Sequence, residues 1–414
     1  MLKRFANASQ ILTVDSFGSG RKKGQDASVL NILSGHDIIV ENGLVKDFIP
    51  FHSPLTTAHR TVDVKGKVIT PGFVECHTHS LFAGDRSAEY RMKLEGKSYE
   101  DIAAMGGGIV SSVRAVRETP ESDLLTLLLK RVDNFISQGV TSLEIKSGYG
   151  LSYDAELKML RVIKKAASLR NINIIPCFLG AHTVPIEYKQ DRKKYLSILI
   201  NELLPVIKAE NLSNRCDAFC ESSAFSPDEV EQLFIVAKSL GYNLTLHTEQ
   251  FNNIGGIELA LQMDALSVDH LEVLKDEQIK LFGDSQTVAV LLPGVSYTLD
   301  YSFAPARKLI DSGATVALAT DYNPGTSNIN SIFLIMSLAA RKLKMTFEEI
   351  ISAYTINSAA ALGISNETGS LEPGKSADFA ILDISNYEQI IYNTAQNFNQ
   401  MTVKSGKIIY NKSN

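Results

Sequence analysis

Five of the eight histidines in the chain stand at or just after short apolar runs, where they can act together. They are His77, His79, His182, His247 and His270. His77 and His79 are separated by one residue on an extended segment, so their side chains point to the same side. Two imidazoles on one side of a strand end can share a metal ion at about 2.1 Å. We therefore expect this pair to form part of a metal site.

A third imidazole and a carboxylate follow later apolar runs. The run NLTL leads into His247, and the run VALAT leads into Asp321. Three imidazoles and one carboxylate suit zinc or iron, and they leave room for a water molecule whose pKa the metal lowers towards neutrality. The expected chemistry is hydrolysis by that water. Asp321 can also accept the proton of the water and deliver it to a leaving nitrogen.

The elements that position these groups follow a regular pattern. Strand-like runs alternate with helical patterns through the middle of the chain, which predicts βα units around a parallel sheet. The eight expected strands are 68–76, 140–146, 172–180, 216–221, 242–247, 264–270, 287–292 and 315–320. In a (β/α)₈ barrel the reactive groups gather at the carboxyl ends of the strands. The five histidines and Asp321 stand at such ends, so we predict an α/β protein with a TIM barrel and one site at its C-terminal face.

The two ends of the chain resemble each other and differ from the middle. Both consist of short strand-like runs joined by turns that contain glycine, proline and asparagine. We expect residues 1–70 and 368–414 to form one small, discontinuous β-sandwich domain, and residues 71–367 to form the catalytic barrel.

Composition narrows the class of protein. Hydrophobic residues make up 44% and charged residues 21% of the chain, a balance typical of a packed globular enzyme. The net charge of −5 argues against binding to nucleic acid or to an anionic membrane surface. The N-terminus shows no signal peptide, and no segment has the length of apolar sequence that a membrane span needs, so we expect a cytoplasmic protein. We expect buried, reduced thiols at Cys76, Cys177, Cys216 and Cys220.

The order of the motifs resembles the amidohydrolase superfamily. The chain carries, in this order, the segments PGFVECHTH, LHTEQF, DHLE and ATDYNPG. Within the superfamily it resembles the imidazolonepropionase family of histidine degradation. That resemblance rests on the segments HTHSLFAGDRSAEYRMKLEGKSY, MGGGIVSSVRAVR, EIKSGYGL, FLGAHTVP and ATDYNPGTS. It implies a metal-dependent hydrolase that opens the ring C–N amide bond of 4-imidazolone-5-propanoate to give N-formimidoyl-L-glutamate.

The resemblance also implies a role for individual residues. One Zn²⁺ or Fe²⁺/Fe³⁺ ion per subunit of a homodimer would be held by His77, His79, His247 and Asp321. The substrate would be bound by Arg86, Tyr149, His182, Gln250, Asn323, Gly325 and Thr326. The catalytic groups would be Asp321, His270 and His182.

The chemistry of these side chains agrees with such roles. Arg86 can offer a bidentate cationic fork to the propionate tail. His270 can polarise the scissile carbonyl or orient the attacking water, and His182 can bind the ring or the developing oxyanion. Lys146 stands where binuclear relatives place a bridging carboxylated lysine, and we interpret it as a structural charge. Glu221 is a candidate partner for the metal water or the ring.

Three alternative functions remain open from the sequence alone. A nucleobase-type deaminase would need a glutamate three residues after His247, where this chain has Gln250. A hydantoinase-like cyclic amidase would need a carboxylated Lys146 and a second metal ion. An inactive barrel scaffold would be expected to have lost ligands. The general base is also open, since Asp321, His270 and the region of Glu249 and Gln250 are all candidates.

Overall fold

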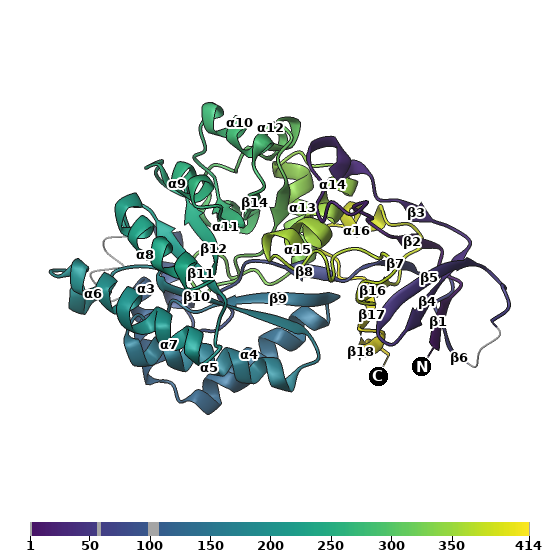
Figure 1. Cartoon of the computed structure of the whole chain (residues 1–414), viewed down its shortest axis with the longest axis horizontal. Helices are drawn as coiled ribbons and strands as arrows, with labels where there is room; N and C mark the ends of the chain where they lie inside the picture. Colours follow the sequence, from purple (N-terminus) through teal and green to yellow (C-terminus); the bar gives the residue numbers. More distant parts are fainter. Residues whose placement is uncertain (1, 56–58, 98–106, 414) are drawn as a thin grey trace.

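A computed structural model describes residues 2–55, 59–97 and 107–413. Two of the segments that carry the family resemblance extend beyond the described residues. These are the last two residues (98–99) of HTHSLFAGDRSAEYRMKLEGKSY and the first two residues (105–106) of MGGGIVSSVRAVR. The barrel consists of eight parallel strands in sequence order (Figure 1). They are β8 (Phe73–Glu75), β9 (Val140–Lys146), β10 (Asn173–Ala181), β11 (Arg215–Cys220), β12 (Asn243–Thr248), β13 (Ser267–His270), β14 (Val288–Leu291) and β15 (Val316–Leu318). The predicted (β/α)₈ barrel is confirmed.

The barrel closes at the carboxyl ends of its first and last strands. Thr78 and Tyr322 form a parallel bridge there. The His79 amide donates to the Tyr322 carbonyl at 3.0 Å, and the Asp321 amide donates to the His77 carbonyl at 3.1 Å. The two segments that carry the expected ligands are therefore joined by their own backbones.

One predicted strand is divided between two sheets. The run 68–76 was expected to form the first barrel strand, but it breaks at Gly72. Its first half, β7 (Val68–Pro71), joins the terminal sheet, and only β8 enters the barrel. A side chain at Gly72 would collide with Thr141 of β9, so the break depends on glycine. Since every residue of the run is buried, its apolar pattern does not reveal the change of sheet.

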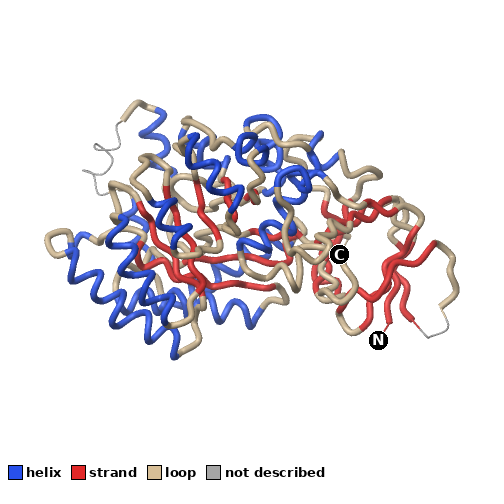
Figure 2. The backbone as a smooth tube through the Cα atoms, turned by 45° about the horizontal axis from the view of Figure 1, so that its top comes forward, coloured by secondary structure: helices blue, strands red, loops and turns tan. Residues whose placement is uncertain are grey.

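Helices cover the outside of the barrel (Figure 2). Those that precede β11 are α1 (Ser87–Leu94), α3 (Ile109–Glu118), α4 (Glu121–Ile136), α5 (Tyr153–Leu169), α6 (Arg192–Ile198) and α7 (Leu204–Ala209). Those that follow are α8 (Pro227–Ser239), α9 (Gly256–Gln262), α10 (Asp276–Asp284), α11 (Pro293–Leu299), α12 (Ala306–Asp311), α13 (Ile332–Lys342), α14 (Phe347–Ser352), α15 (Ser358–Ala361) and α16 (Gln389–Tyr392). Helix α4 shows why they form: Pro120 precedes it, and Leu124, Leu128 and Val132 line the face that packs on the core.

Segments from both ends of the chain form two further sheets beside the barrel. One has the order β5-β4-β1-β6 and the other β18-β17-β16-β7-β2-β3. Their strands are β1 (Leu2–Ala6), β2 (Gln10–Leu12), β3 (Ile32–Leu33), β4 (His36–Glu41), β5 (Leu44–Pro50), β6 (His59–Asp63), β7, β16 (Phe379–Leu382), β17 (Asn399–Lys404) and β18 (Lys407–Asn411). The two sheets share a core in which the rings of Phe5 and Phe379 meet edge to face at 4.7 Å. Both termini lie in this part of the molecule (Figure 2).

One expectation about the cysteines agrees with the structure. All four cysteines are buried free thiols. Among the helices of the described ranges, none combines the length and the hydropathy needed to cross a bilayer.

Candidate metal centre and active site

The four expected metal ligands lie together at the carboxyl ends of β8, β12 and β15. Asp321 Oδ1 is 3.4 Å from His77 Nε2 and 3.3 Å from His79 Nε2, and His247 Nε2 is 3.4 Å from His79 Nε2. Ligand atoms around a tetrahedral ion with bonds of about 2.1 Å are separated by about 3.4 Å. All four side chains are buried. The spacing of these atoms therefore suits a single metal ion.

Unsatisfied atoms at this point also favour a cation. Within the described part of the chain, the buried atoms His77 Nε2 and Asp321 Oδ1 have no hydrogen-bond partner. Leaving a buried carboxylate oxygen without a donor is costly, and a metal ion removes that cost. Burial raises the pKa of Asp321, but His77 and His79 outweigh burial and hold it well below its usual range. The donor set is thus three imidazoles and an ionised carboxylate, which fit a divalent metal.

Two buried carboxylates orient His77 and His247 by contacting their Nδ1 atoms. His77 Nδ1 donates to Asp269 Oδ2 at 2.6 Å, and His247 Nδ1 lies 2.9 Å from Asp217 Oδ2. Each contact fixes the ring so that its Nε2 atom faces the other ligands. Neither acid was among the site residues predicted from the sequence. The signal for them was present, since a charged residue in a fully buried strand requires a partner.

Lys146 lies beneath these two carboxylates. Its Nζ atom is 2.7 Å from Glu144 Oε2, 2.8 Å from Asp217 Oδ2 and 3.8 Å from Asp269 Oδ2. Burial lowers the pKa of Lys146, but the charges of Asp217 and Glu144 outweigh it and raise the pKa well above its ordinary value. A lysine must lose its proton before it can be carboxylated. The geometry therefore agrees with a structural charge and argues against a bridge between two metal ions.

Replacing Asp269 with asparagine is expected to weaken metal binding by about 10–100-fold, because the imidazole of His77 loses its charged partner. The affinity can be measured by competition between the metal-free protein and a chromophoric chelator. Asp378→Asn is a matched control, since Asp378 is a buried aspartate that pairs with Lys404 in the terminal sheet. It should lower stability but leave the metal affinity unchanged. Equal affinities for wild type and Asp269→Asn would contradict the orienting role.

The loop after β9 holds Tyr149 beside the metal ligands. Its amides at Gly148, Gly150 and Leu151 all donate to the buried carboxylate of Glu156 in α5, at 2.8–3.2 Å. The Tyr149 ring lies 5.8 Å from that of His79. Glu156 could not be predicted from the sequence, because its partners are backbone amides rather than side chains.

His182 stacks on His79 with ring centroids 5.0 Å apart. Its Nδ1 atom donates to the Gly148 carbonyl at 2.9 Å. Burial, followed by the nearby His79, lowers the pKa of His182 to about 3, so the ring is neutral. A neutral imidazole that donates through Nδ1 can only accept a hydrogen bond at Nε2. Of the two expected roles, contact with a ring N–H therefore fits His182 better than stabilisation of an oxyanion.

Arg86 meets the loop after β15 on the other side of the site. Its guanidinium lies against Gly325, where any side chain would collide with it. The Asn323 side chain shapes this loop by accepting the amides of Gly325 and Thr326 at 2.8 and 2.7 Å. Arg86 also pairs with Glu89, at 2.7 Å from Nη2. The structure thus brings together four of the residues expected to bind the substrate.

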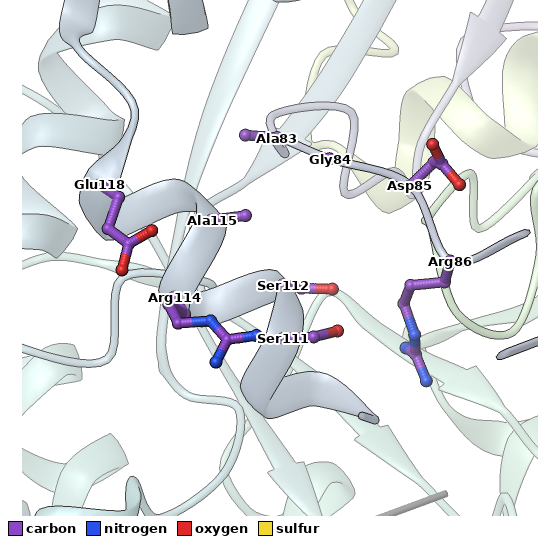
Figure 3. Close-up of a pocket in the computed structure, with 9 residues that line it drawn as sticks. All are labelled: Ala83, Gly84, Asp85, Arg86, Ser111, Ser112, Arg114, Ala115 and Glu118. Atoms are coloured by element: carbon purple, nitrogen blue, oxygen red, sulfur yellow. The ribbon is translucent and has the colours of Figure 1, made fainter. Parts of the chain in front are cut away.

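A surface cavity of about 230 Å³ lies beside Arg86 (Figure 3). It is bounded by the segment 83–86 and by α3, from which Ser111 and Arg114 contribute side chains. Among the described residues, Arg86 is the member of the candidate site that lines it. The cavity therefore borders the site and is not the metal centre itself.

The loop after β12 places Gln250 and its neighbours. Glu221 accepts the amides of Phe251 and Asn252 at 3.0 and 3.1 Å, so its carboxylate shapes this loop. Glu249 accepts the amide of Gly256 at the start of α9. One oxygen of its carboxylate is therefore engaged at that helix. Burial raises the pKa of Glu249 to about 7, so Glu249 stays a candidate for proton transfer beside Asp321 and His270.

Comparison with known proteins shows the family to which the chain belongs. The model of the amidohydrolase family matches residues 68–409, so the chain belongs to this family. A crystal structure of a triazine hydrolase variant has a similar fold, with a TM-score of 0.77 over 99% of this chain and 95% of that one. Its sequence identity is 16%, which shows a shared fold alone.

Within the family the chain groups with the imidazolonepropionases. It is 41% identical to an imidazolonepropionase of Clostridium tetani over 411 residues, which cover 98% of both proteins. It is 46% identical to an imidazolonepropionase of Agrobacterium fabrum over 339 residues, which cover 82% of this chain and 81% of that protein.

Proposed function

We propose that this chain is an imidazolonepropionase. It would add water to 4-imidazolone-5-propanoate and release N-formimidoyl-L-glutamate in histidine degradation. The observation that carries the proposal is the convergence of His77, His79, His247 and Asp321, with ligand atoms 3.3–3.4 Å apart, beside an arginine that can bind a carboxylate. The identity of 41% over 98% of the chain supports it.

The proposed reaction breaks the ring bond between the carbonyl carbon and its neighbouring nitrogen. Water oxygen adds to the carbonyl carbon, and the ring nitrogen leaves as part of the formimidoyl group. A bound Zn²⁺ or iron ion would supply Lewis acidity towards the water and the carbonyl. Asp321 would hold the proton of the water at a carboxylate oxygen and pass it to the departing nitrogen. The low pKa of Asp321 supports its starting as an acceptor.

Other residues would bind and orient the substrate. Arg86 would hold the propionate, and the loop of Asn323, Gly325 and Thr326 would offer amides and a hydroxyl to its polar edge. Tyr149 would bound the substrate on the side of His79. His182 would accept a ring N–H at Nε2, as its neutral state allows. Gln250 would contact the ring, since an amide binds but does not shuttle protons.

Replacing Arg86 with methionine is expected to raise KM by about 10–100-fold, because the variant loses a charge-assisted hydrogen bond to the propionate. Turnover at saturation should fall less. Steady-state kinetics measure both values. Arg114→Met is the matched control, since Arg114 stands across the cavity on α3 and should leave KM unchanged. An unchanged KM for Arg86→Met would show that the carboxylate is bound elsewhere.

A panel of substrates tests the function. Purified protein should convert 4-imidazolone-5-propanoate to N-formimidoyl-L-glutamate and should leave cytosine, guanine and hydantoin intact. Gln250 in place of the glutamate that a deaminase needs, and Lys146 held between Glu144 and Asp217, both argue against the two rival activities. Turnover of a nucleobase or a hydantoin without turnover of the imidazolone would overturn the proposal.

We propose the remaining features from the same family likeness. The protein would act as a homodimer in the cytoplasm, without nucleic acid or membrane partners. The segments 1–70 and 368–414 would form a β-sandwich domain separate from a catalytic domain of 71–367. The shared core of the two terminal sheets supports this division. Light scattering would measure the mass of the assembly.

A further inference from the structure

A buried polar cluster lies behind His270. It contains Glu272, from the DHLE motif, together with Gln250 and Tyr301. His270 Nδ1 is 3.5 Å from Glu272 Oε2, and the two side chains are 3% and 1% exposed. Neither the binding of the metal nor the mechanism above assigns any function to Glu272 or Tyr301.

The groups that face each other in this cluster are unsatisfied. Within the described residues, both oxygens of Glu272 and the Nδ1 atom of His270 lack a hydrogen-bond partner, although all three are buried. A buried carboxylate without a donor is costly. A small rotation of the His270 ring would close the 3.5 Å separation to a hydrogen bond. His270 Nδ1–H is therefore a nearby donor that can supply what Glu272 lacks.

Tyr301 connects this pair to the substrate side of the site. The Gln250 side chain lies 3.5 Å from the Tyr301 hydroxyl, and the Tyr301 ring stacks on Phe251 at 5.8 Å. Burial, followed by the charge of Glu272, raises the pKa of the Tyr301 hydroxyl above its ordinary value. Tyr301 thus remains a protonated donor near the Glu272 carboxylate.

The backbone and position of His270 indicate that its orientation matters. His270 and Leu271 have φ angles of 91° and 72°, a conformation that costs free energy for residues with a side chain. A ring nitrogen of His270 also lies within 4.8 Å of ligand atoms of His77 and Asp321. The strained turn therefore places the His270 ring near both the metal centre and Glu272.

We infer that Glu272 is a positioning residue that accepts His270 Nδ1–H, with Tyr301 donating to the carboxylate, so that His270 Nε2 faces the metal centre as an acceptor. A histidine that donates through Nδ1 offers a lone pair at Nε2. His270 then orients the attacking water by accepting its hydrogen, and it does not polarise the carbonyl as a donor. The catalytic part of this inference rests on the proposed function, whereas the pairing of His270 with Glu272 does not.

Kinetics of three variants test the role. Glu272→Leu is expected to lower kcat by about 100-fold, within the range for loss of an orienting partner. Its KM should stay within about threefold of wild type, and its metal content should stay at one ion per chain, because Glu272 would contact His270 and Tyr301 rather than the substrate or the metal. Glu272→Gln, which keeps an acceptor oxygen, should recover part of this loss. Tyr301→Phe, a gentler change, should lower kcat by about tenfold.

A matched control separates positioning from stability. Glu349 is a buried glutamate that caps α14 and pairs with Arg307, so Glu349→Gln should lower stability but leave kcat unchanged. Equal losses of kcat in Glu349→Gln and Glu272→Leu, or a wild-type kcat in Glu272→Leu, would overturn the inference. A rise in KM without a fall in kcat would also overturn it.

A measurement without substrate distinguishes this inference from the proposed function. In zinc-loaded protein with ¹⁵N-labelled histidine, long-range ¹H–¹⁵N spectra should show His270 protonated at Nδ1, with the signal assigned from a His270→Asn sample. Protonation at Nε2 alone would overturn the pairing whatever the activity. If the tautomer is as expected but the imidazolone is not hydrolysed, the proposed function fails and the pairing stands.

Discussion

Replacing Asp321 with asparagine is expected to lower kcat by about 10³-fold while the protein still binds metal, because an amide oxygen can remain a ligand but cannot accept a proton. The structure places Asp321 Oδ1 within 3.4 Å of both His77 Nε2 and His79 Nε2. The backbone amide of Asp321 is fixed by the His77 carbonyl at 3.1 Å. The substitution should therefore change the chemistry of the group more than its position.

The measurement is kcat for samples of equal metal content, determined on the same preparations as the metal analysis. Near-normal turnover with metal retained would show that Asp321 is a ligand alone, and would assign the proton transfer to His270 or Glu249. If turnover falls only in proportion to the loss of metal, the weaker metal binding alone explains the effect. That result would also contradict the role of Asp321 in proton transfer.

Replacing His247 with alanine is expected to have the larger effect on metal content. The substitution removes one imidazole ligand and leaves Asp217 without the ring that it orients at 2.9 Å. We expect less than one bound ion per chain under conditions that saturate wild type, and a fall in turnover of about 10⁴-fold or more. Elemental analysis and steady-state kinetics measure the two effects.

His52→Ala controls for the loss of a histidine as such. His52 is exposed and lies between β5 and β6, outside the barrel. It should match wild type in metal content and turnover. Full metal content in the His247→Ala variant would contradict the ligand set derived from the geometry.

The sequence was most informative where chemistry and strand ends coincide. Short apolar runs of a parallel barrel all end on the same face. The residues that follow NLTL and VALAT, His247 and Asp321, could therefore be expected to meet although they lie far apart in the chain. In the structure both side chains approach His79 Nε2, Asp321 Oδ1 at 3.3 Å and His247 Nε2 at 3.4 Å. The eight strands were also recognisable, because each is a mostly buried run bounded by polar residues or glycine.

A charge in a buried strand, such as that of Asp217 or Asp269, indicates that a partner exists, but the partner itself could not be predicted where it is distant or belongs to the backbone. Glu156 binds three amides of its own loop, and Asp217 and Asp269 bind the far sides of histidine rings. No local pattern specifies such contacts, because they depend on how strands align in register across the sheet. The break at Gly72 was hidden for a similar reason, since two different sheets bury the same run.

The most direct test of the account is a crystal structure of the metal-loaded protein with anomalous data collected at the edge of the bound metal. We predict one anomalous peak per chain, within bonding distance of His77, His79, His247 and Asp321, and an unmodified Lys146. A second peak beside a carboxylated Lys146 would contradict the single-ion centre. A lone peak held by other residues would contradict the assignment of the ligands.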